Sequence, residues 1–168
     1  MTAKMGGGAM LAVALGIGAA VGVGGALAHD DVMPANASAA TKAAYARHDN
    51  FRRLGGAFKA LNDELKKPTP SKAVLVSNAN AINTLAAGLP TWFPRGSGME
   101  ARPMSEAKAL IWTDAAGFSA KAAALRAEAG RLSAAASGGD LDAIRAQARQ
   151  TFLACKGCHE TYRQEKKG

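Results

Sequence analysis

The sequence predicts an all-α protein, an antiparallel up-down-up-down four-helix bundle preceded by an N-terminal targeting segment. Three observations lead to this prediction. Alanine and glycine are abundant and aromatic residues make up only 5% of the 168 residues, while the β-branched runs typical of strands are nearly absent. Apolar residues recur at spacings of three and four along four long segments, which is typical of amphipathic helices. One longer and two short connections join these segments, as an up-and-down bundle requires.

Residues 1–28 are predicted to be a secretory signal peptide. Lys4 provides a positive start, the following stretch is apolar, and an Ala-Leu-Ala triplet ending at Ala28 forms a small-x-small cleavage site before charged residues. Cleavage after Ala28 leaves residues 29–168 as the mature domain, which we expect in the periplasm. An uncleaved membrane anchor is the alternative, because about 20 apolar residues can span a bilayer.

The charge pattern excludes one class of partner. The formal net charge of +8 becomes +7 once Lys4 is removed with the signal peptide. The basic residues are scattered, and no groove-like pattern of lysine, arginine and aromatic residues appears, so nucleic acid is not expected to bind. A solvated basic face is the first interpretation, and attraction to acidic proteins or membrane surfaces is the second.

The first two helices have clear starts and stops. Ser38 is a suitable N-cap for a helix that runs to about Lys67, and Pro68 stops it. Ser71 can cap the second helix, which ends near Pro90. The apolar stripe of the first helix contains Phe51, Leu54, Phe58, Leu61 and Leu65. The stripe of the second contains Leu75, Ile82, Leu85 and Leu89.

The third predicted helix runs from about Ser105 to Ser137 after a proline- and glycine-rich loop, and it has the most regular period in the chain. Gly138-Gly139 ends this helix, and Asp140 caps the fourth. The heptad positions of the third helix are Ile111, Ala115, Phe118, Ala122, Leu125, Ala129, Leu132 and Ala136. One face of the fourth helix carries Leu141, Ile144, Ala148, Phe152, Cys155, His159 and Tyr162.

The fourth helix contains the sequence Cys155-Lys156-Gly157-Cys158-His159. Two thiols one helical turn apart can each add to a vinyl group of one porphyrin, and the next histidine then lies against the iron. A redox dithiol or disulfide and half of a zinc site are the alternatives. The redox motif usually opens a helix after a strand, and zinc requires further ligands that are absent nearby. The motif therefore predicts one covalent haem c on Cys155 and Cys158, with His159 as iron ligand.

The first helix carries a second pattern, in which Arg47 is followed four residues later by Phe51 and eight residues later by Gly55. Further motifs are Trp92-Phe93-Pro94 through Gly98, Ile111-Trp112 through Phe118, and Cys-x-x-Cys-His-x-x-x-Arg ending at Arg163. In this order along one chain, with the haem motif near the C-terminus, they resemble cytochrome c′, the class II c-type cytochromes. The resemblance covers the whole mature chain.

The resemblance implies roles for four further residues. Phe51 corresponds to the residue that faces the sixth coordination position, with an ordinary core aromatic as the alternative. Because phenylalanine cannot ligate, the iron is expected to be five-coordinate. Arg47 is expected to meet a haem propionate, with a solvated surface arginine as the alternative. Arg163 is expected on the proximal side near His159, with a place in the basic tail as the alternative. Gly55 is expected to permit close approach of haem or of a neighbouring helix.

A methionine outside the first helix is the remaining alternative ligand, and the candidates are Met33, Met99 and Met104. The family resemblance implies a periplasmic haem protein that binds nitric oxide and carbon monoxide, with no established enzymatic turnover. A soluble electron carrier with a redox partner protein is the alternative function. The resemblance also implies a homodimer formed through the first two helices.

Overall fold

The computed structural model describes residues 32–165. The chain separates into two units, Met1–Asp30 and Asp31–Gly168, and the described residues belong to the second. The predicted signal peptide and its cleavage site therefore lie outside the described residues. Within residues 32–165, no helix is long and apolar enough to cross a membrane.

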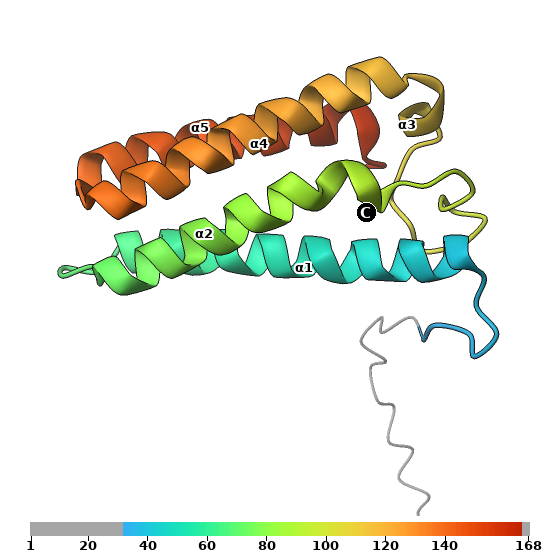
Figure 1. Cartoon of the computed structure of the whole chain (residues 1–168), viewed down its shortest axis with the longest axis horizontal. Helices are drawn as coiled ribbons and strands as arrows, with labels where there is room; N and C mark the ends of the chain where they lie inside the picture. The colour runs from blue at the N-terminus through green and yellow to red at the C-terminus, as the bar shows by residue number, and fades with distance from the viewer. Residues whose placement is uncertain (1–31, 166–168) are drawn as a thin grey trace, which may run out of the picture. The chain divides into compact units, whose positions relative to one another are not determined.

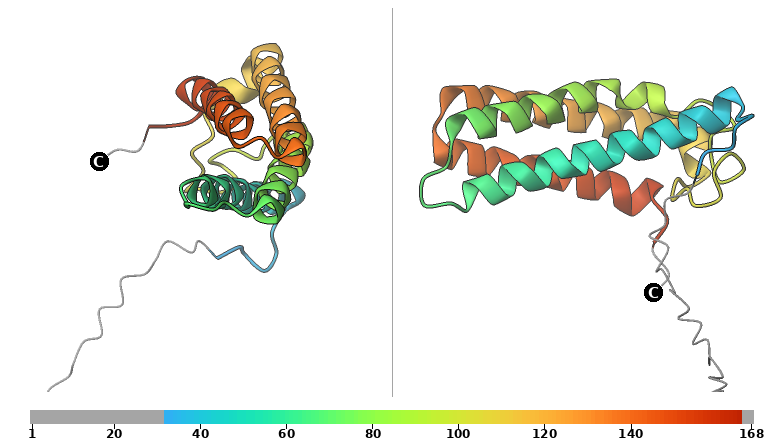
Figure 2. Two further views of the ribbon diagram at one scale, coloured as in Figure 1. Left: turned by 90° about the vertical axis from the view of Figure 1, so that its left-hand side faces the viewer. Right: turned by 90° about the horizontal axis from the view of Figure 1, so that it is seen from below.

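The described unit is a four-helix bundle, as the sequence predicts (Figure 1). Its long helices are α1 (Ala39–Leu65), α2 (Lys72–Gly88), α4 (Ala115–Gly138) and α5 (Leu141–Tyr162). The long connection between α2 and α4 contains the 3₁₀ turn η1 (Leu89–Trp92) and the one-turn helix α3 (Leu110–Thr113). Helix α1 packs on α2, α2 on α4 and α4 on α5, whereas α5 contacts α1 only sparsely, as the end view in Figure 2 shows.

Local capping explains the predicted helix boundaries. The Ser38 hydroxyl accepts a hydrogen bond from the Thr41 amide at 3.1 Å and starts α1. The Asp140 carboxylate accepts from the amides of residues 142 and 143 and starts α5. Between α4 and α5, Gly139 has a φ of +87°, a left-handed conformation that favours glycine. The predicted starts of α1 and α5 and the end of α4 are thus confirmed. Helix α2 starts directly after Ser71 as predicted, but the Ser71 side chain makes no capping hydrogen bond there.

The predicted start of the third helix at Ser105 is wrong. The chain forms only one helical turn, α3, before it breaks at Asp114 and starts again as α4. The Asp114 carboxylate caps α4 by accepting from the Gly117 amide at 3.0 Å, and its other oxygen accepts from the Tyr162 hydroxyl at 2.6 Å. These two bonds satisfy the Asp114 carboxylate in its non-helical position and stabilise the break. Seven of the eight predicted heptad positions are buried, but Ala115, at the start of α4, is exposed.

The core changes character along the bundle. One part is aliphatic, and its largest fully buried apolar side chains are Leu61, Leu75, Ile82, Leu132 and Ile144. The end that contains the long connection is instead rich in aromatic rings. Alanines fully buried in the α2–α4 seam, such as Ala79 and Ala129, allow these helices to approach closely.

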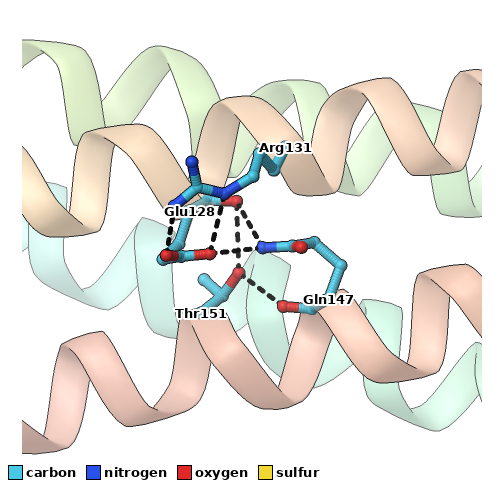
Figure 3. Close-up of polar contacts among 4 residues, drawn as sticks. All are labelled: Glu128, Arg131, Gln147 and Thr151. Atoms are coloured by element: carbon cyan, nitrogen blue, oxygen red, sulfur yellow. Dashed lines mark hydrogen bonds and ion pairs between the residues drawn. The ribbon is translucent and has the colours of Figure 1, made fainter.

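A polar cluster of four residues joins α4 to α5 inside this framework (Figure 3). The Gln147 side-chain amide donates to the Glu128 carboxylate at 2.6 Å, and Arg131 pairs with the same carboxylate. The buried Thr151 hydroxyl lies 2.9 Å from the Gln147 carbonyl oxygen and 3.4 Å from that of Glu128. The hydrogen bonds from Arg131 and Gln147 lower the pKa of Glu128, which therefore stays ionised. The cluster holds α5 against α4 one turn before Cys155.

Candidate haem site

Both cysteines lie in the C-terminal half of α5, half-buried and free. They are three residues apart and therefore share one face of the helix. Burial raises the pKa of Cys155 to about 11, and the neighbouring Cys158 adds to this effect. Burial also raises the pKa of Cys158, against the opposing charge of Lys121. At neutral pH both groups are therefore thiols, and each can supply the sulfur and the hydrogen that add across a vinyl double bond.

His159 follows directly and presents its imidazole on the same side of α5, in an exposed position. Burial of part of the ring lowers its pKa, and the charge of Arg163 lowers it further, whereas the Glu106 carboxylate opposes both. The imidazole is therefore neutral at neutral pH, and a neutral imidazole is the form that binds a metal ion. The structure thus brings Cys155, Cys158 and His159 together, and Arg163 is close enough to influence the histidine.

The end of α5 is held by a set of contacts that we call the proximal frame, formed by residues 106–108 and 162–164 with Asp114. The Lys108 amide donates to the Tyr162 carbonyl at 3.0 Å, and the Gln164 amide donates to the Glu106 carbonyl at 2.7 Å. The Arg163 guanidinium donates to the Glu106 carboxylate at 2.6 Å. His159, the predicted iron ligand, is therefore one helical turn from a short antiparallel bridge.

The Tyr162 hydroxyl completes the proximal frame by donating to Asp114. This bond raises the pKa of Tyr162 to about 12. The same bond and the hydrogen bond from the Gly117 amide both lower the pKa of Asp114. A Cβ atom at Gly117 would overlap both the Asp114 carboxylate and the Tyr162 hydroxyl. Glycine at this position therefore permits the close approach of the Asp114 and Tyr162 side chains, which an added methyl group would displace.

The face of α5 that carries the cysteines is only partly covered by protein. Phe152, which lies on this face one turn before Cys155, is 52% exposed, although it belongs to the predicted stripe. Leaving such side chains in water costs about 25 cal/mol for each Å² of apolar area. Because α5 contacts α1 only sparsely, a flat apolar group bonded to the two thiols would cover this face. The donor set and the uncovered apolar face therefore fit haem.

Gly55 and Gly56 lie on the exposed part of α1, and an added Cβ at either would meet no heavy atom within 4 Å. Among the described residues, no neighbouring helix approaches Gly55, so that part of the prediction is wrong. The approach of haem to Gly55 stays a prediction.

Phe51 is half-buried on α1 and belongs to a row of aromatic rings. Its ring is edge-on to Trp92, with centroids 5.2 Å apart, and to Phe93 at 6.2 Å. Phe93 packs against Phe118 at 4.7 Å, and Phe118 packs against Tyr162 at 5.4 Å. The row connects α1 to the end of α5, and such edge-on pairs stabilise beyond their buried area.

Arg47 is buried in the bundle and is bonded to the connection that follows α2. Its side chain is only 4% exposed, so the interpretation as a solvated arginine is wrong. One terminal nitrogen donates to the Trp92 carbonyl and the Ser97 hydroxyl, and the other donates to the Ser97 carbonyl and the Ser105 hydroxyl. The predicted contact with a propionate remains untested. Because both terminal nitrogens already donate two hydrogen bonds each, Nε is the nitrogen left for such a contact. Sequence reasoning missed the two serines, because nothing local marks residues 50 and 58 positions away as partners.

The candidate sulfur ligands lie elsewhere. Met99 and Met104 are each 52% exposed in the connection before α3, and Met33 is 43% exposed before α1. None of the three belongs to the apolar cluster that contains Phe51 and both cysteines. Their positions therefore give no support to ligation by an outside methionine.

Fold and site together define a c-type cytochrome built on a four-helix bundle. The family model described as cytochrome C′ matches residues 42–163, and the chain belongs to the cytochrome c′ family. Cytochromes c′ from Alcaligenes xylosoxydans xylosoxydans and Pararhodospirillum photometricum are 37% and 34% identical over 121 and 118 residues. These matches cover 71% and 70% of this chain, and 91% and 93% of the relatives.

Among solved structures, a nitric oxide complex of a cytochrome c prime variant from Alcaligenes xylosoxidans superposes with a TM-score of 0.68 at 30% identity. The match covers 76% of this chain and 97% of that one. Covalently attached haem c is the cofactor of the family and therefore of this chain.

Proposed function

We propose that this protein is a periplasmic haem protein that binds small uncharged gases, nitric oxide and carbon monoxide above all. In this proposal the thiols of Cys155 and Cys158 carry the haem, and His159 holds its iron from the proximal side. When bound, the haem supplies an iron with one position open to a diatomic ligand. The observation that carries the proposal is Phe51 on α1, a side chain without a ligating atom that packs against the rings of Trp92 and Phe93.

Phe51 determines which ligands the site can accept. Its ring restricts access and must move aside for a diatomic molecule to enter. It offers no hydrogen-bond donor, so a ligand that depends on such a donor gains nothing from it. Nitric oxide and carbon monoxide are neutral and do not require one. A similar solved structure is a nitric oxide complex of a relative, which supports the proposal.

The proximal side of the proposal rests on the proximal frame. The bridge between residues 106–108 and 162–164 fixes the helix end that bears His159, and the neutral imidazole is ready to bind metal. Ligand exchange is therefore expected on the distal side. No enzymatic turnover is part of this proposal. The homodimer and the redox partner stay predictions from the sequence.

Absorption spectra and carbon monoxide kinetics of three proteins test the proposal: wild type, Phe51→Ala and Phe51→Met. The wild-type ferrous protein should be five-coordinate. Phe51→Ala should bind carbon monoxide at least about tenfold faster, which is about 1.4 kcal/mol of barrier. Phe51→Met should become six-coordinate and bind the gas more slowly, because it introduces a sulfur ligand.

Leu65→Ala is the matched control, because Leu65 lies on the same helix about 21 Å further along at 1.5 Å per residue. It should lower stability without changing the gas kinetics. A six-coordinate wild-type ferrous spectrum, with gas kinetics unchanged in both Phe51 variants, would favour the electron carrier and reject gas binding.

A further inference from the structure

We infer that Arg47 is a positioning residue that fixes the distal wall of the haem site by holding the connection between Trp92 and Ser105, called here the distal loop, against α1. This inference rests on the proposed function, because it explains how the ring of Phe51 is kept in place. It assigns to Arg47 a role separate from contact with a propionate.

The hydrogen bonds of Arg47 reach three separate points of the distal loop. It donates to the Trp92 carbonyl at 3.2 Å at the beginning, and to the Ser105 hydroxyl at 3.1 Å at the end. In the middle it donates to the hydroxyl of Ser97 at 2.9 Å and to its carbonyl at 2.6 Å. Ser97 is fully buried, and its hydroxyl also donates to the Pro94 carbonyl at 2.7 Å. One side chain therefore ties both ends and the centre of the loop to α1.

The guanidinium remains charged in this buried position. Burial, together with the charge of Arg102, lowers the pKa of Arg47 to about 10, and Glu100 opposes the shift. The group is thus protonated at neutral pH, and each of its bonds to the loop is charge-assisted. Its central carbon lies 4.6 Å from the centroid of the Phe93 ring, which adds a cation–π contact.

Phe51 depends on the segment that Arg47 holds. The two residues are one turn apart on the same face of α1. The rings that support Phe51 are those of Trp92 and Phe93, and Arg47 contacts the carbonyl of the first and the ring of the second. Loosening the distal loop would let both rings shift and would give Phe51 room to move. Arg47 therefore controls how readily the distal position opens.

Two variants of the holoprotein, Arg47→Lys and Ser97→Ala, separate this role from a propionate contact. Lysine keeps the charge but cannot make the forked set of bonds. Ser97→Ala removes a loop partner and leaves Arg47 itself unchanged. Arg53→Lys, at an exposed position of α1, is the matched control.

Hydrogen exchange of amides 92–105 and the rate of carbon monoxide binding to the ferrous protein are measured for each variant. Both Arg47→Lys and Ser97→Ala should exchange faster in the loop and bind the gas several-fold faster, with full haem content, while the control matches wild type. Unchanged loop exchange in both variants would overturn the inference, as would a loosened loop that leaves gas binding at the wild-type rate.

Failure of the proposed function is distinguishable from failure of this inference. A wild-type protein that binds no carbon monoxide would reject gas binding, and loop exchange alone would then decide whether Arg47 positions the loop. Arg47→Lys could instead change the reduction potential while Ser97→Ala keeps wild-type loop exchange and wild-type carbon monoxide binding. That result would assign Arg47 to a propionate contact and overturn its role in positioning the loop.

Discussion

The two helices that border the haem site are both tied to the long connection between α2 and α4, but by different bonds. The end of α5 pairs with it through backbone hydrogen bonds at Tyr162 and Gln164, with an ion pair at Arg163. Helix α1 is tied through the side chain of Arg47 and the ring contacts of Phe51. Backbone pairing fixes position more firmly than side chains, which can change rotamer. The α5 side, where we propose that His159 holds the iron, is thus expected to be the firmer one, and the α1 side, where we propose that gas enters, is expected to yield more readily.

The largest expected effect is the loss of covalent haem when the α5 side of the site is changed and the α1 side is left intact. Replacing both cysteines, in Cys155→Ala with Cys158→Ala, should abolish covalent haem, because all the attachment chemistry lies on α5. Acidic organic solvent should then extract all colour from the variant, whereas wild type and Phe51→Ala should keep theirs in the protein phase. Complete extraction of colour from wild type would contradict covalent attachment.

A second test weakens the proximal frame alone. Gly117→Ala should destabilise the protein by about 1–3 kcal/mol, because the added methyl group overlaps Asp114 and Tyr162. Denaturant unfolding of the holoprotein measures the change. Gly138→Ala is the control, because a Cβ there meets nothing within 4 Å, and it should be neutral or stabilising by up to about 1 kcal/mol. Equal effects of the two substitutions would show that the frame is not tightly packed at Gly117.

The smallest expected effect is a pH dependence of the same frame. The hydrogen bonds from Tyr162 and Gly117 lower the pKa of Asp114 below its ordinary value of 3.8. Its contribution to stability is therefore fully present above that value and is lost as pH falls through the depressed pKa. Asp114→Asn should flatten the decline in unfolding free energy below about pH 4, relative to wild type and to Asp49→Asn on exposed α1. Parallel acid limbs for all three proteins would contradict this assignment.

Local signals in the sequence predict much of this fold. The caps at Ser38 and Asp140 act on amides two or three residues away, so the starts of α1 and α5 can be predicted. The haem motif is contiguous, and its three residues share one helix. The break at Asp114 has a local cap on the Gly117 amide, but the regular heptad runs across it, and its second partner, Tyr162, is 48 residues away. The partners of Arg47 lie 45 to 58 residues away, so only the folded chain shows what the buried arginine holds.

The sparse contact between α1 and α5 also bears on assembly. The three close helix seams join elements that follow one another along the chain, and such local contacts form quickly. The remaining seam joins the first and last helices, whose meeting requires closure of the longest loop in the domain. We therefore expect a bundle that can form with one side open, so that haem enters laterally between helices already in place. On that route the bound haem fills the space between α1 and α5 and so completes the packing of the bundle.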